Sequence, residues 1–125
     1  MDPLGLVWGV SVVSGRCSEA EGAKRLLLKV RDQLSRWALV WMDGGDENRI
    51  EAWVAEHCRF RVEIVKRSEG ARGWELLPKR WVVERTYGWL NWWRGLAREY
   101  DFLPETTEAK ILLAMTRLML RRLTA

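Results

Sequence analysis

The chain has 125 residues, enough for one domain with a hydrophobic core. Hydrophobic residues make up 48% and charged residues 30%, a balance that argues against global disorder. The longest apolar run, residues 111–120, is interrupted by Arg117 and is too short to span a membrane. The N-terminus lacks the pattern of a signal peptide, so a cytoplasmic location is expected.

The charge is uneven along the chain. Residues 1–59 carry 8 Lys or Arg and 9 Asp or Glu, whereas residues 60–125 carry 13 and 8. A basic half is consistent either with a nucleic-acid partner or with an ordinary solvated surface. Cys17, Cys58 and the single His57 do not have zinc-ligand spacing, and no pattern typical of a catalytic triad is present.

The first half of the chain predicts alternating strands and helices. Residues 4–13, rich in Val, Leu and Trp, fit a buried strand. Ser18 followed by Glu21 is a capping box, which predicts a helix from there to about Trp37. The other elements expected in this half are a strand at 38–42, a helix at 47–57 and a strand at 60–65.

The second half predicts a loop at 68–73 and then two helices. The first is expected from about Lys79 to Tyr100, with Pro78 at its start. Its expected core stripe comprises Val82, Trp89, Trp93, Leu96 and Tyr100. The last helix, about 105–123, follows Pro104. Strands and helices that alternate in the first half, followed by helices in the second half, predict an α/β domain with a small mixed sheet.

Asp43 is the first candidate functional residue. It follows the apolar strand ALVWM directly and precedes Gly44-Gly45. Open α/β sheets bind ligands at the carboxyl ends of their strands. An Asp in an ordinary turn is the alternative interpretation.

Glu84 is the second candidate, because it interrupts an apolar stretch on a predicted helix. Residues about one turn apart place a small face beside it, comprising Arg80, Glu84, Gly88, Asn91 and Gly95. Each glycine inside a helix costs about 1 kcal/mol relative to alanine, so close approach of a large partner is indicated. That partner is either DNA beside a carboxylate–metal site, or another helix with Glu84 paired to Arg80 or Arg85. Two carboxylates near a basic surface suggest Mg²⁺.

Four segments carry a resemblance to a known family. Residues 75–123, with the block RWVVERT, resemble the C-terminus of DDE transposases of small bacterial insertion sequences, the "IS five" group. The segments at 2–13, 40–45 and 56–68 resemble that family in the same order, so the resemblance covers essentially the whole chain.

The resemblance implies an RNase H-like (retroviral-integrase-like) catalytic domain in which three carboxylates hold two Mg²⁺ or Mn²⁺ ions. Asp43 matches the second carboxylate, and Glu84 matches the third, with Arg80 four residues before it. The family's first Asp lies upstream of the segment matching Asp2, which is a turn. The resemblance therefore implies that residues 1–125 are a partial, N-terminally truncated domain. The first strand, the first Asp and the N-terminal DNA-binding region would be absent, and residues 104–125 would form the C-terminal helix.

The resemblance also implies double-stranded DNA as a partner, at insertion-sequence ends and at the target. The family places a Lys or Arg about two turns after its Glu, where this chain has Asn91 and Trp92. Trp92 could stack on an unpaired base, or pack in the core or an interface. The expected DNA-binding residues are Lys79, Arg80, Arg85, Trp92 and Arg94.

The expected function is Mg²⁺-dependent cleavage at insertion-sequence ends and strand transfer into target DNA, in the bacterial cytoplasm at the nucleoid and without a membrane. An upstream-frame product or a full-length transposase is an expected partner. The alternatives are an inactive DNA-binding or regulatory fragment, and the product of a degenerate element.

Overall fold

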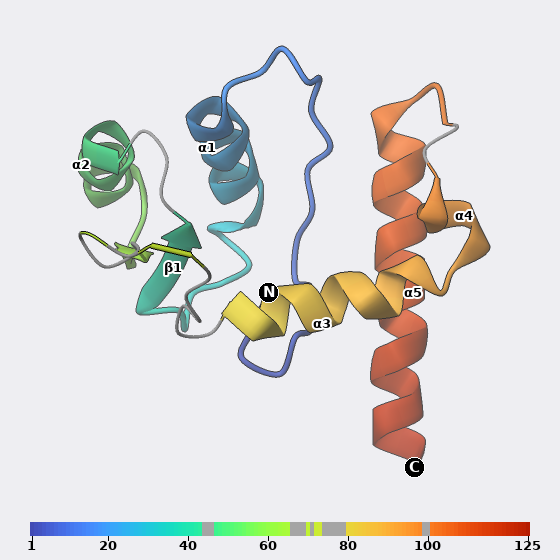
Figure 1. Cartoon of the computed structure of the whole chain (residues 1–125). Helices are drawn as coiled ribbons and strands as arrows, with labels where there is room; N and C mark the ends of the chain where they lie inside the picture. The colour runs from blue at the N-terminus through green and yellow to red at the C-terminus, as the bar shows by residue number, and fades with distance from the viewer. Residues whose placement is uncertain (44–46, 66–69, 71, 74–79, 99–100) are drawn as a thin grey trace. The chain divides into compact units, whose positions relative to one another are not determined.

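The computed structural model describes residues 1–43, 47–65, 70, 72–73, 80–98 and 101–125. The chain divides into two compact units, Met1–Ser14 with Lys79–Ala125, and Gly15–Pro78. Its elements are α1 (Glu19–Val30), β1 (Leu39–Asp43), α2 (Glu47–His57), β2 (Arg61–Val65), α3 (Arg80–Asn91), α4 (Arg94–Ala97) and α5 (Pro104–Thr124) (Figure 1). No helix in this described part is long and apolar enough to cross a membrane.

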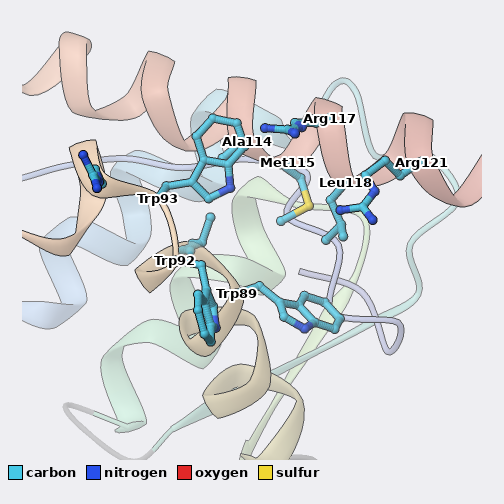
Figure 2. A pocket seen from close by; sticks show the side chains of 10 residues that line it. Trp89, Trp92, Trp93, Ala114, Met115, Arg117, Leu118 and Arg121 are labelled. Atoms are coloured by element: carbon cyan, nitrogen blue, oxygen red, sulfur yellow. The ribbon is translucent and has the colours of Figure 1, made fainter.

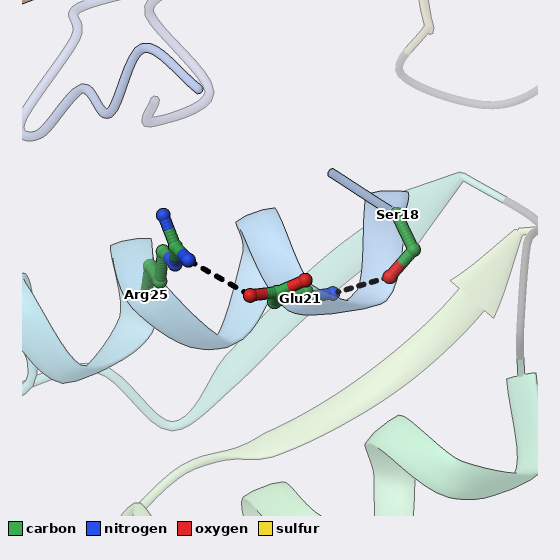
Figure 3. A network of polar contacts seen from close by, with 3 residues as sticks. All are labelled: Ser18, Glu21 and Arg25. Carbon is green, nitrogen blue, oxygen red and sulfur yellow. Dashed lines mark hydrogen bonds and ion pairs between the residues drawn. The ribbon is translucent and has the colours of Figure 1, made fainter. Parts of the chain in front are cut away.

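Helix α1 begins as its capping signal predicts. The Ser18 Oγ accepts a hydrogen bond from the Glu21 backbone N–H at 3.2 Å, and the Glu21 carboxylate pairs with Arg25 at 2.8 Å (Figure 3). The prediction that this helix reaches Trp37 is wrong, because α1 ends at Val30. The following stretch contains Asp and Ser, which compete with helical hydrogen bonding. Short backbone turns follow α1 instead, and the Leu34 side chain within them is buried.

Strands β1 and β2 pair in parallel, with α2 as the connection between them. Val40 pairs with Val62 and Met42 with Ile64, and all four pack against the core. The core cluster comprises Leu27, Ile50, Val54 and Phe60. The alternation of side chains along a strand gives Asp43 the parity of the exposed Trp41 rather than that of the core residues. These elements confirm the predicted ones to within one residue.

Residues 4–13 are not a strand, contrary to the prediction. Backbone groups of this segment bond to helix side chains, with Thr86 donating to the Gly5 carbonyl at 2.8 Å and Glu108 accepting from the Val12 N–H at 2.8 Å. A strand requires a neighbouring strand, and the two described strands belong to the other unit. The sheet is consequently a parallel pair in the described residues rather than the mixed sheet predicted.

The long helix predicted from Lys79 to Tyr100 is interrupted. Helix α3 ends at Asn91, and the N–H groups of Trp92 and Trp93 bond three residues back, as in a tight turn. Trp93 takes an extended conformation before α4, which lies beside α5 (Figure 1). Tyr100 lies outside the described residues.

Helix α5 starts with Pro104, whose missing N–H costs nothing in the first turn. Its inward residues are Thr107, Ala114 and Met115. Two of its apolar side chains, Leu112 and Leu123, are instead 41% and 82% exposed.

Candidate functional site

Asp43 is the last residue of β1 and is paired in register with Val65 of the parallel neighbour. Its side chain is exposed. Gly44, Gly45 and Asp46, which follow it, lie outside the described residues. The carboxylate therefore sits at the strand end where parallel sheets place ligands, as the sequence predicts.

Glu84 lies on α3 and is exposed. Its Oε1 is 3.7 Å from the Nε of Arg80, and the two side chains are 66% and 49% exposed. An exposed ion pair of this kind contributes about 0–1 kcal/mol, so Glu84 is held loosely and is accessible to a ligand. Of the two partners suggested for Glu84, the structure pairs it with Arg80.

The small face beside Glu84 is only partly formed. A Cβ added at Gly88 would have nothing within 4 Å, so among the described residues no helix packs closely there. Gly95 lies in α4, beyond the break, and the nearest atom to its added Cβ is in Lys110 at 3.7 Å. The five residues are therefore not one continuous helical face, which corrects that part of the prediction.

The Arg85 side chain makes several contacts with other residues of the chain. Its guanidinium lies 4.7 Å from the ring centroids of both Trp81 and Trp89, and it donates to the Leu4 carbonyl at 2.9 Å. Its buried Nε has no hydrogen-bond partner. These contacts tie the N-terminal segment to α3. A direct DNA contact by Arg85 stays a prediction.

The remaining predicted DNA-binding residues are exposed where they are described. Trp92 is 88% exposed, and Arg94 begins α4 with an exposed side chain. Lys79 lies outside the described residues. Trp92 and Arg94 line one groove together, so the structure brings these two predicted residues to the same place.

Helix α5 also contributes basic residues to that groove. The sequence pattern did not group them with Trp92 and Arg94. Arg117 and Arg121 both line the groove, and Arg117 lies 5.5 Å from the Trp93 ring centroid. Their spacing of four residues places them on one helix face. That spacing is the one signal that could have grouped them, but it does not say what the face opposes.

The carboxylates suit a hard divalent cation in their chemistry, since Mg²⁺ binds carboxylate oxygens. Asp43 belongs to the unit of residues 15–78 and Glu84 to the other unit. Among the described residues, no three His, Cys, Asp or Glu side chains gather as a metal site would need. Both carboxylates are exposed, each in its own unit.

Comparison with known proteins gives one finding. A family model described as "Transposase DDE domain" matches residues 40–121. No curated protein and no solved structure gives a significant match. The matched range begins within β1 and ends within α5, so it contains both Asp43 and Glu84.

Proposed function

Because the chain belongs to the transposase DDE domain family and thereby to the proteins of DNA transposition, we propose that it supplies Asp43 and Glu84 to a transposase catalytic site. The reaction proposed is cleavage of phosphodiester bonds at the ends of an insertion sequence, followed by strand transfer into target DNA. The observation that carries the proposal is the family match, which spans both carboxylates and the helix that presents Glu84.

Asp43 and Glu84 are the residues that would hold Mg²⁺ or Mn²⁺. A bound divalent ion supplies a lowered pKa for attacking water and stabilisation of the leaving oxygen. The exposure of both side chains supports this role, and so does the weak, exposed ion pair that Glu84 makes with Arg80. The family's first Asp is proposed to come from a segment other than residues 1–125, on an upstream-frame product or a full-length transposase.

The basic half of the chain is proposed to hold double-stranded DNA near Glu84. Arg80 lies one turn before Glu84 and is 49% exposed, so its guanidinium can reach a phosphate without leaving the carboxylate. Charge-assisted bonds from arginine to phosphate are short and directional. Arg80 is thus proposed to position the DNA backbone beside the carboxylate that acts on it.

A transposition assay in bacterial cells tests the proposal. The complete element, with the DNA that flanks this reading frame, is compared with versions carrying Asp43→Asn or Glu84→Gln. Loss of a group that supports a metal ligand commonly costs about 10–100-fold, so loss of a ligand itself should reduce transposition by at least about 100-fold. Asp32→Asn is the matched control, because Asp32 is 91% exposed in the same unit as Asp43.

Wild-type transposition by both Asp43→Asn and Glu84→Gln elements would overturn the proposal. A second measurement addresses the regulatory alternative, by supplying the chain in trans to an active element. Repression that both carboxylate variants retain, together with unimpaired transposition by those variants in the element, would identify a non-catalytic regulatory protein.

A further inference from the structure

A groove of about 440 Å³ lies between the Trp92–Trp93 turn and α5, within the unit formed by residues 1–14 and 79–125 (Figure 2). That volume falls within the range of about 300–1,000 Å³ found for small-molecule sites. Trp89, Trp92 and Trp93 line it from α3 and the turn that follows, and Arg117 and Arg121 line it from α5 (Figure 2). Trp92, Trp93 and Arg94 of its lining follow the end of α3 at Asn91, within the stretch predicted to be helical.

The aromatic residues of the groove are not equivalent. Trp89 has Arg85 and Arg122 over its ring, at 4.7 and 4.9 Å from the centroid, and Trp93 has Arg117 at 5.5 Å. Trp92 is 88% exposed. A tryptophan exposed to this degree presents a broad π surface to solvent, on which another flat ring can stack.

The polar residues of the groove carry a single sign of charge. Arg94, Arg117 and Arg121 line it, and no Asp or Glu is among its lining residues in the described part of the chain. A cluster of arginines without an opposing carboxylate attracts an anion, and the guanidinium fork matches phosphate geometry. Stacking surface and phosphate-binding charge therefore occur together in one groove.

We propose that this groove binds an unpaired stretch of DNA, with one base stacked on Trp92 and the adjacent phosphates on Arg94, Arg117 and Arg121. The proposal rests on the proposed function for its choice of DNA, and it adds the single-stranded state and the residues that recognise it. Paired bases inside a duplex cover each other's faces, so only an unpaired base can offer its face to Trp92.

Fluorescence anisotropy with the purified full chain tests this. The probe is a labelled oligothymidylate of about 12 nucleotides, within the length that single-strand-binding folds occupy. Trp92→Ala should weaken binding about 5- to 150-fold, the range found when a stacking aromatic is removed. Trp92→Phe, which keeps an aromatic face, should restore most of the affinity. Phe102→Ala is the matched control, because Phe102 is 97% exposed and does not line the groove.

Salt dependence tests the arginines separately. For single strands, each phosphate contact contributes about −0.7 to the slope of log affinity against log salt concentration. Arg94→Ala and Arg121→Ala should each make the slope shallower by about that amount, whereas Arg36→Ala, at an exposed position of the other unit, should leave it unchanged. If Trp92→Ala does not unfold cooperatively as the wild type does, the salt dependence of Arg94→Ala and Arg121→Ala tests DNA binding by the groove instead.

The proposal would be overturned if Trp92→Ala bound oligothymidylate with wild-type affinity. It would also be overturned if the chain bound an equally long duplex, oligouridylate or polyglutamate more tightly than oligothymidylate. A groove that fails this test while Glu84→Gln still abolishes transposition leaves the proposed function standing. A groove that passes while Glu84→Gln transposes normally leaves the groove standing and removes the proposed function.

Discussion

Gly5 provides the sharpest test of how the N-terminal segment packs on α3. Its φ is +78°, and an added Cβ would lie 2.6 Å from the Thr86 Oγ1 and 3.2 Å from both Arg85 and Trp89. Gly5→Ala therefore combines two costs. A side chain in the left-handed region costs about 1–2 kcal/mol, and a forced shift in a packed site costs about 1–3 kcal/mol. Together they predict a loss of about 2–5 kcal/mol in the free energy of unfolding of the unit that contains Gly5, residues 1–14 and 79–125.

Two other glycines separate these costs. Gly70 has φ +83°, and no atom of the described residues lies within 4 Å of an added Cβ there; the same holds for Gly15, which has no positive φ. Gly70→Ala should cost only the backbone term of about 1–2 kcal/mol, and Gly15→Ala should stay within about 0.5 kcal/mol of the wild type. Urea unfolding followed by tryptophan fluorescence and far-ultraviolet circular dichroism measures all three. A Gly5→Ala cost no larger than that of Gly70→Ala would show that residues 1–14 do not pack on α3 as described.

Three further predictions concern other parts of the chain. Met115, 2% exposed, should lose about 2–5 kcal/mol of unfolding free energy on Met115→Ala, whereas Leu123→Ala, at an 82% exposed position, should change it by less than about 0.5 kcal/mol in the same urea experiment. Ser18→Ala removes the cap of α1 and should cost about 1 kcal/mol; an unchanged urea midpoint would contradict the capping role. Burial raises the pKa of the Cys58 thiol, so at about pH 8 it should react with a disulfide reagent more slowly than an unfolded chain does, and equal rates would contradict this.

Elements controlled by short-range signals were predictable. The Ser18 cap placed the start of α1, Pro104 placed the start of α5, and the β1–α2–β2 run was predicted to within one residue. Caps and first-turn prolines act through hydrogen bonds within a few residues, so their effect can be inferred locally. The positions of Asp43 at a strand end and Glu84 on a helix followed from the same local patterns.

Elements that depend on distant partners were not predictable. The segment at 4–13 has the composition of a strand, yet its backbone groups bond to side chains of α3 and α5. The break after Asn91 interrupts a run with helical periodicity, and beyond it the Trp93 ring lies 5.5 Å from Arg117 of α5. Both outcomes depend on contacts between residues far apart in the chain.

Motif order and local patterns thus contained the family resemblance, the two carboxylates and most helix and strand boundaries. The groove was not predictable in this way, because it joins Trp92 and Arg94 to two arginines of α5 that lie more than twenty residues further along the chain. Composition showed that the second half is basic, but not that its arginines would converge on an exposed tryptophan. Only tertiary packing decided this, since long-range contacts set which faces of two helices meet and which side chain remains exposed between them.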